Sequence, residues 1–210
     1  MGYLMSLVYD RVMRGVEEAG LRAWRRALLA QASGRVLEVG AGTGVNLGLY
    51  PEAVDELVAS EPDRWMVKRL ERAAAQVSRP RVTVAQASLE GLPFEDGAFD
   101  TVVCTLVLCS VPELAEAVGE IKRVLRPGGR LLFLEHVAAR DRPTRLRWQR
   151  RVEPVWRRVA GGCCLTRRTE EALRSAGFSI EAIERESMRK VFALARPSIR
   201  GVAVKPEAQP

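Results

Sequence analysis

The sequence predicts an α/β fold in which helices cover both faces of a doubly wound, mostly parallel sheet. Two observations lead to this prediction. Short apolar runs of strand character alternate with longer segments whose apolar residues recur at helical spacing, and the first run ends in the alternate glycines Gly40, Gly42 and Gly44. The 210 residues suit one domain. We expect it to span residues 1–205, with a helical cap at 1–30, a basic amphipathic insert at 140–160 and a disordered tail at 206–210.

The N-terminal segment has an apolar stripe at helical spacing, which predicts a helix that covers the ligand site. Its members are Leu4, Leu7, Val8, Val12 and Val16.

The apolar run from Val36 to Val39 predicts a buried strand that stops at a glycine turn, where a ligand can approach backbone N–H groups. The glycines follow G-x-G-x-G, and Val45 stands where a dinucleotide fingerprint has its third glycine. Glu38 would repel a pyrophosphate but could orient amide donors or pair with a cationic group. The turn therefore favours a ligand with a positive centre over a dinucleotide.

Further strands and helices alternate along the chain. We expect strands at 54–60, 81–86, 99–104 and 130–136, and helices at 63–77 and 113–125. Ligands of such sheets bind at the carboxyl ends of the strands, and four candidate residues fall there: Gly40, Glu61, Ser88 and Thr105. Glu61 ends its strand at the position where α/β folds place an acid on a ribose diol.

The C-terminal third contains a basic segment and a pair of strands. Between Arg140 and Arg158 arginines greatly outnumber acidic residues, and Pro154 should divide the segment into two short helices. An apolar side is expected from Leu146, Trp148, Val152, Val155, Trp156 and Val159. The segment is an element at a membrane surface, a lid over an apolar pocket, a contact to nucleic acid, or an ordinary core helix with a solvated arginine face. An interfacial role is favoured over a nucleic-acid one. Residues 178–183 and 199–204 should form a closing hairpin.

Three motifs in this order resemble the class I S-adenosylmethionine-dependent methyltransferases: residues 37–44, residues 91–94 with 99–103, and residues 123–129. Residues 104–111, 135–137, 162–166 and 201–205 resemble more narrowly the methyltransferase-like thiol methyltransferases of intracellular membranes. The general pattern is also similar to the ubiquinone and menaquinone methyltransferases. The resemblance implies a Rossmann-like, seven-stranded sheet with a C-terminal antiparallel hairpin, with S-adenosyl-L-methionine as cofactor and S-adenosyl-L-homocysteine as product.

The same resemblance implies roles for individual residues. The glycine loop would surround the methionine part of the cofactor, Glu61 would bind the ribose hydroxyls, and Ser88 stands where many relatives have an aspartate for the adenine amino group. Pro62 and Met66 would flank the adenine, Leu89 would meet its edge with Ser88, and residues 104–106 would line the path to the methyl group. The implied cofactor-binding set is Tyr9, Glu38, Gly40, Ala41, Gly42, Thr43, Gly44, Asn46, Glu61, Pro62, Met66, Ser88, Leu89, Cys104, Thr105 and Leu106.

One histidine is the catalytic candidate. His136 is the only histidine in the chain and ends the fifth predicted strand, where it could accept a proton from a thiol or stabilise the thiolate. A structural histidine is the alternative. Glu135 should point to the opposite face of the strand, which makes it a poor second candidate. None of the four cysteines forms a C-x-x-C pair, so we expect neither a disulfide framework nor a metal site.

These observations predict an enzyme that methylates a small lipophilic acceptor, preferably a thiol. The alternatives are a quinone-precursor or phospholipid amine methyltransferase, an RNA methyltransferase, and a cofactor-binding module without activity. A nucleic-acid partner is not expected. Base-methylating enzymes have an Asn-Pro-Pro turn or a Pro-Cys nucleophile after the fourth strand, and residues 104–107 of this chain contain neither. With no apolar run long enough to span a bilayer and no secretory leader, we expect a cytoplasmic protein, with peripheral contact to an anionic membrane through residues 140–158.

Overall fold

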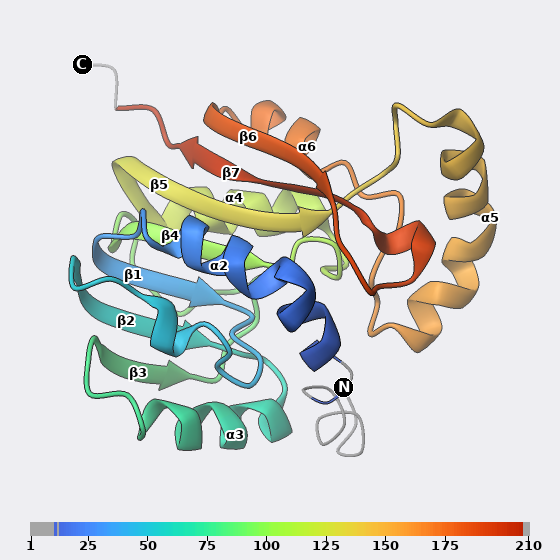
Figure 1. Cartoon of the computed structure of the whole chain (residues 1–210). Coiled ribbons are helices and arrows are strands. Elements are labelled where there is room, and N and C mark those ends of the chain that lie inside the picture. The colour runs from blue at the N-terminus through green and yellow to red at the C-terminus, as the bar shows by residue number, and fades with distance from the viewer. Residues whose placement is uncertain (1–10, 12, 208–210) are drawn as a thin grey trace.

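The computed structural model of the chain describes residues 11 and 13–207, and Figure 1 shows its arrangement. In this part of the chain seven strands form one sheet in the order β3-β2-β1-β4-β5-β7-β6. The first five strands are parallel, while β7 is antiparallel to both β5 and β6. The strands are β1 Gly34–Val39, β2 Val54–Ser60, β3 Arg81–Ala85, β4 Phe99–Thr105, β5 Leu125–His136, β6 Ser179–Ser187 and β7 Pro197–Val204.

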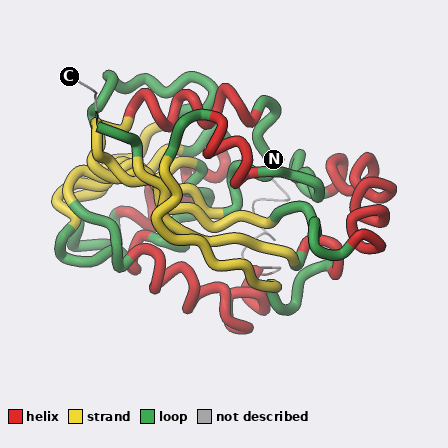
Figure 2. Tube along the Cα trace, turned by 90° about the horizontal axis from the view of Figure 1, so that it is seen from above, coloured by secondary structure: helices red, strands yellow, loops and turns green. Residues whose placement is uncertain are grey.

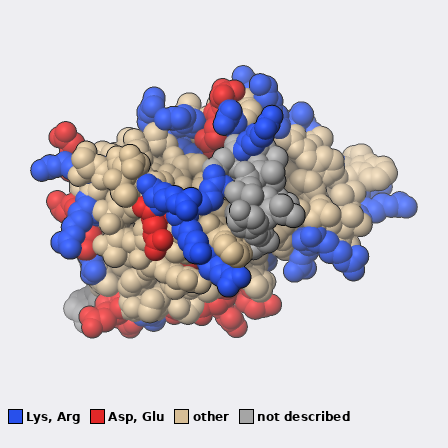
Figure 3. All heavy atoms as spheres, turned by 90° about the horizontal axis from the view of Figure 1, so that it is seen from below, with Lys and Arg blue, Asp and Glu red and all other residues tan. Residues whose placement is uncertain are grey.

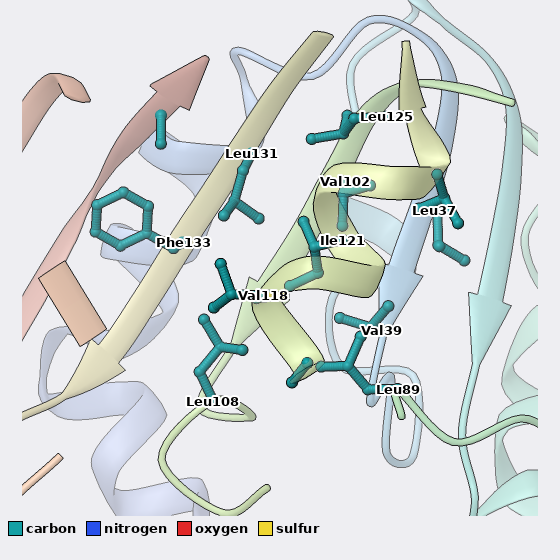
Figure 4. Packing of buried hydrophobic residues seen from close by; sticks show 14 of the residues in the cluster. Leu37, Val39, Leu89, Val102, Leu108, Val118, Ile121, Leu125, Leu131 and Phe133 are labelled. Carbon is teal, nitrogen blue, oxygen red and sulfur yellow. The ribbon is translucent and has the colours of Figure 1, made fainter. Parts of the chain in front are cut away.

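Helices lie on both sides of this sheet, as Figure 2 shows. They are η1 Glu17–Leu21, α2 Arg22–Leu29, η2 Leu47–Leu49, α3 Arg64–Ala74, α4 Leu114–Val124, α5 Pro143–Val159, α6 Thr169–Ser175 and η3 Ala193–Ala195. The buried side chains accordingly form two layers. One lies between the sheet and α4 and α6, where Val118 and Ile121 of α4 project toward Leu131 of β5 (Figure 4). The other lies between the sheet and α2 and α3, and includes Leu29 and Leu70.

The predicted fold class and the C-terminal hairpin are therefore confirmed. β2 has the predicted bounds, and the other strands differ by a few residues at their ends. β5 starts at Leu125 rather than at Arg130, because Leu125 already pairs with Phe99 across a register shift in β4. The strand thus includes the last residue of the predicted helix and residues 126–129, which lay between the two predicted elements.

Strand order reverses between β1 and β4, which are neighbours in the sheet although β2 and β3 lie between them in sequence. Crossovers from β1 and β4 therefore leave in opposite directions, and the loops after these two strands are free to form a crevice at their carboxyl ends. The predicted ligand loop at Gly40 and the residues after Thr105 meet at this position.

The prediction for Pro154 was wrong, because α5 continues from Pro143 to Val159 with this proline inside it. α5 lies at one end of the molecule, beyond the carboxyl ends of the parallel strands (Figures 1 and 2). A proline in a helix removes one N–H and its bond to the carbonyl four residues earlier. Both Arg150, which bears that carbonyl, and Pro154 are exposed, so water can replace the missing bond.

The apolar side predicted for this segment was also partly wrong. Trp148, Val155 and Val159 are more than half exposed, at 54%, 61% and 62%. The side that faces the body instead includes a fully buried amide, Gln149, which accepts from Ala139 N (2.8 Å) and donates to the carbonyls of Val137 (3.2 Å) and Leu194 (2.8 Å). α5 is thus attached to the body by hydrogen bonds as well as by apolar contact.

The predicted N-terminal cap is described only in part. Residues 13–16 are helical, Val16 is buried, and η1 and α2 continue along the sheet. Leu4, Leu7, Val8, Tyr9 and Val12 lie outside the described residues. None of the helices in the described part combines the length and the apolar character that crossing a bilayer requires.

Candidate active site

Two glycines in the loop after β1 have different roles, because Gly40 contacts the loop after β4 and Gly42 leaves its backbone open. Gly40 has a φ of 60°, and a Cβ added there would lie 2.6 Å from the Val107 side chain, so this glycine lets β1 end against the loop after β4. Gly42 has a φ of 59°, but no described atom lies within 4 Å of its added Cβ. The backbone at Gly42 is therefore open to a ligand, whereas Gly40 is needed for packing.

Glu61 faces this loop from the end of β2. Its Oε2 accepts from Gly42 N and its Oε1 from Asp63 N, each at 3.0 Å. Burial raises the pKa of this carboxyl, and the two backbone donors lower it less. Each oxygen has a further lone pair, so the carboxylate can accept from a ribose diol without losing its present contacts. An open loop beside such an acceptor fits S-adenosylmethionine, as the sequence predicted.

Asp63 fixes the turn that follows Glu61. Its Oδ1 accepts from the backbone N–H groups of Trp65 (2.9 Å) and Met66 (3.1 Å), which is the N-cap of α3. The cap fixes the first turn of α3, in which the side chain of Met66 is buried. That Met66 flanks the adenine stays a prediction.

The other residues of the predicted adenine site are Pro62, which follows β2, and two residues after β3, Ser88 and Leu89. Leu89 is buried, while Pro62 and Ser88 are exposed. The Ser88 hydroxyl donates to the carboxylate of Glu90. An acidic group therefore lies next to the position where many relatives have an aspartate, a feature that the sequence analysis missed.

Glu38 of β1 holds the glycine loop in place through hydrogen bonds. It is buried, and its two carboxylate oxygens accept from Asn46 Nδ2 and from the Tyr50 hydroxyl, both at 2.7 Å. Burial raises the pKa of Glu38, and these two hydrogen bonds oppose the shift. The sequence suggested that Glu38 could orient amide donors or pair with a cationic group. The structure shows that it orients an amide, since it fixes the side chain of Asn46 at the end of the glycine loop.

Arg25 completes this buried network and was missed by the sequence analysis. Its Nη1 donates to Thr105 Oγ1 (2.6 Å) and to Asn46 Oδ1 (3.1 Å), and its Nε donates to Glu17 Oε1 (3.0 Å). One guanidinium thereby joins α2, the glycine loop and the end of β4. The signal was available, because Arg25 lies four residues after Leu21 and before Leu29, on the apolar side of its helix.

The segment after β4 forms the predicted acceptor side of the crevice. Cys104 and Thr105 are buried, and Leu106 has a φ of 62°, a left-handed conformation that is costly for a residue with a Cβ. Leu106 N donates to Leu134 O of β5 at 2.7 Å, which helps to fix this conformation.

Glu135 organises the next three residues. Its carboxylate is buried and accepts from Val107 N (2.9 Å), Leu108 N (3.0 Å) and Cys109 N (3.2 Å). Burial raises its pKa, and the three N–H donors oppose the shift. Glu135 and His136 belong to opposite faces of β5, as the sequence predicted, but the buried Glu135 has a positioning role that the sequence did not reveal.

His136 is buried at the end of β5, and its Nε2 lies 2.8 Å from Cys163 Sγ. Burial lowers the pKa of His136, but its interactions with Cys163, a backbone hydrogen bond and the charge of Glu135 together outweigh this effect, and the net shift of the pKa is upward. The pKa of Cys163 is raised by its hydrogen bond with Cys109 and by burial. The candidate catalytic histidine is therefore one member of a group that also contains Cys109 and Cys163, whose sulfurs and His136 nitrogen lie within 4.8 Å of one another.

Comparison with known proteins identifies the family of this chain and supports its fold. The methyltransferase domain family matches residues 37–133. The human thiol S-methyltransferase TMT1B is 37% identical over 97% of this chain and 85% of its own length, and human TMT1A is 39% identical over 81% of this chain and 70% of its own. Among solved structures, the YcgJ protein of Bacillus subtilis superposes with a TM-score of 0.70 at 20% identity, covering 91% of this chain and all of that one.

Proposed function

This chain belongs to the thiol S-methyltransferase family of class I S-adenosylmethionine-dependent methyltransferases, and from this premise we propose that it methylates the sulfur of a small lipophilic thiol. The observation that carries the proposal is 37% identity to a thiol S-methyltransferase over 97% of this chain. The methyltransferase activity itself follows from the family; the thiol acceptor is the proposed part.

The chain's own residues perform the binding and the alignment. S-adenosylmethionine, when bound, supplies an electrophilic methyl group on a good leaving group. The open backbone at Gly42 and the carboxylate of Glu61 would bind it, and Arg25 and Glu38 keep the floor of that site in place through Asn46. Alignment of two reactants at near contact can lower a barrier by about 7–11 kcal/mol.

The acceptor side suits a lipophilic sulfur compound. Leu106 is partly exposed and supplies apolar surface at the end of β4, whereas Cys104 is fully buried in the core. Glu135 fixes the loop that follows through three hydrogen bonds to its backbone N–H groups. A thiol must lose its proton before attack, because the thiolate is the nucleophile. His136 already pairs with Cys163 through Nε2, so the Cys109–His136–Cys163 group as a whole, rather than a free imidazole, is our candidate for stabilising that thiolate.

The experiment that tests the acceptor is release of S-adenosylhomocysteine from the purified protein, supplied with S-adenosylmethionine and a matched alkyl thiol, alcohol and amine. We expect turnover with the thiol alone. Turnover with the alcohol or amine, or no turnover with the thiol despite cofactor binding, would refute a thiol acceptor and redirect the search to quinones and phospholipid amines.

We also propose that α5 contacts the surface of an anionic membrane, from which a lipophilic acceptor could enter the crevice. Its exposed side presents Trp148, Val155 and Val159 among exposed arginines, and Phe192, which stacks on Trp156 at 4.9 Å, extends this apolar surface. Figure 3 shows basic side chains at the end of the molecule where Figure 1 places α5. Apolar side chains surrounded by arginines favour an interface with anionic lipid headgroups.

A vesicle sedimentation assay tests this contact. We expect binding to anionic vesicles that decreases with salt, little binding to phosphatidylcholine vesicles, and weaker binding of Arg151→Glu. The matched control is Arg72→Glu on α3, an equal charge change at an exposed site outside α5. Equal loss in both variants would show that net charge alone, and not α5, determines binding.

A further inference from the structure

Three soft ligand atoms from distant parts of the chain meet in one place. Cys109 comes from the loop after β4, His136 from the end of β5 and Cys163 from the connection between α5 and α6. Their sulfur and nitrogen atoms all lie within 4.8 Å of one another, and His136 Nε2 is 2.8 Å from Cys163 Sγ. The sequence analysis expected no metal site because it considered only cysteines that are close in sequence.

The backbone places these side chains independently of any ion. Cys164 N donates to Cys109 O at 2.8 Å, which joins the two cysteine-bearing segments. Gly162 has a φ of 88°, and an added Cβ would lie 3.2 Å from Ser110 O, so only a glycine allows the second segment to approach so closely. Glu135 fixes Cys109 by accepting from its N–H at 3.2 Å. The group is therefore built by the fold and is not a chance contact of mobile side chains.

The ligand set and its surroundings suit a thiophilic divalent cation. Zinc bonds to thiolate sulfur at about 2.3 Å and to imidazole nitrogen at about 2.0–2.1 Å, so tetrahedral ligands are about 3.5–3.8 Å apart. In the structure His136 Nε2 and Cys163 Sγ are 2.8 Å apart, and no two of the three ligand atoms are more than 4.8 Å apart. These separations would change by about 1 Å or less to reach the zinc geometry. The buried carboxylate of Glu135, which accepts from the backbone N–H of Cys109, adds negative charge nearby. His136 Nδ1 is buried and has no hydrogen-bond partner among the described residues.

We propose that Cys109, His136 and Cys163 bind Zn²⁺ through three protein ligands, and that the thiol acceptor takes the fourth position. Two thiolates and one imidazole leave a tetrahedral zinc ion with an open position, which is the pattern of catalytic rather than structural sites. Cys163 is the least buried of the three residues, so this position is reached from its side. The inference rests on the proposed thiol acceptor and states how that thiol becomes a nucleophile.

The reaction balances without a further reactant. On coordination the acceptor loses its S–H proton to solvent, since a metal-bound thiol is deprotonated. Its sulfur then forms the new bond to the methyl carbon while the bond from that carbon to the sulfonium breaks, and the electron pair of the broken bond remains on S-adenosylhomocysteine. The product thioether is a neutral, weaker ligand and leaves.

The position of the group fits this role. Leu106 N donates to Leu134 O of β5. His136 follows Leu134 by two residues on the same strand, a distance of about 7 Å along β5. Leu106 lies on the predicted path to the methyl group. The proposed metal position therefore lies at the same carboxyl edge of the sheet as the predicted path to the methyl group.

Binding of Co²⁺ to the full-length, reduced protein tests the site directly, because tetrahedral thiolate-bound cobalt gives intense visible and near-ultraviolet bands. We expect one Co²⁺ per chain, displaced by Zn²⁺. In Cys163→Ser the affinity should fall by about 100-fold or more, since it loses a ligand and not merely a second-shell partner. The matched control is Cys164→Ser, because Cys164 is adjacent in sequence, and its thiol contacts Gly162 O at 3.6 Å instead of joining the group. It should bind like the wild type.

Several outcomes would overturn the site. No cobalt bands in the wild type, or equal bands in wild type and Cys163→Ser, would do so. A Cys109–Cys163 disulfide that persists under mild reductant would exclude it as well. Circular dichroism of each variant shows whether a lost site merely reflects unfolding, and His136→Ala provides a second ligand deletion.

Activity separates this proposal from the proposed function. We expect chelator-treated protein to lose thiol turnover by at least about tenfold and to regain it with Zn²⁺. Full thiol turnover in metal-free protein would refute the catalytic metal and leave the thiol acceptor intact. Metal binding with no thiol turnover would refute the acceptor while the site itself stands.

Discussion

Glu135→Gln tests whether one buried carboxylate organises the acceptor side of the crevice. The carboxylate accepts three backbone N–H groups, two at Oε1 and one at Oε2. Glutamine retains one oxygen, so its amide group must face either Cys109 N or the other two donors, and at least one buried N–H loses its partner. Such a loss costs about 1–3 kcal/mol, and the weakening of the remaining charge-assisted bonds adds to it.

The charge lost with this substitution offsets part of that cost, because burial raises the pKa of Glu135 and so disfavours its ionised form. We expect a net loss of about 2–3 kcal/mol in the free energy of unfolding. For a chain of this length this lowers Tm by about 4–12 °C. The cofactor loop makes none of these bonds, so affinity for S-adenosylhomocysteine should be nearly unchanged while turnover falls.

Urea denaturation, calorimetry and a turnover assay measure these effects. The matched control is Glu184→Gln, whose side chain is 60% exposed and pairs with Arg200 at the surface of β6. It should cost less than about 1 kcal/mol. An unchanged Tm and unchanged turnover in Glu135→Gln would refute the argument that this carboxylate positions residues 107–109.

Three further predictions concern the cofactor side. Burial raises the pKa of Glu38 above its ordinary value of 4.5, so the native state binds this proton more tightly than the unfolded state does. Wild type should therefore gain stability relative to Glu38→Gln as the pH falls from 7 toward about 4.5, measured by urea denaturation; a constant difference would contradict the shift. Arg25→Met should lower the free energy of unfolding by about 3 kcal/mol, because it leaves Glu17 and Thr105 without their buried partner. It should also weaken S-adenosylhomocysteine binding, measured by calorimetry. Unchanged stability and binding would show that the network is dispensable. Ser88→Asp should bind S-adenosylhomocysteine about tenfold more tightly, through a charge-assisted bond to the adenine amino group, and no gain would place the adenine elsewhere.

The sequence alone was sufficient for the fold and for the glycine turn after β1, because the signals for both are local. Helical and strand periodicities are local, and the glycines of the first turn encode backbone conformations that other residues rarely adopt. The position of Glu61 follows from the length of one β-α-β unit. These features depend on neighbours in sequence, so they were visible before any tertiary structure was known, as was the end of β5 at His136.

Only the tertiary structure decided how side chains from distant segments combine. Arg25 looked like one of several arginines on a surface helix until the fold buried it between Thr105 and Asn46. Cys163 gave no metal signal, because its partners lie 54 and 27 residues away and meet it only through the pairing of β4 with β5 and the return of the chain after α5. Likewise, which side of α5 faces the body was decided by Gln149 and its backbone partners, because a periodic apolar pattern cannot show where a neighbouring segment offers hydrogen bonds.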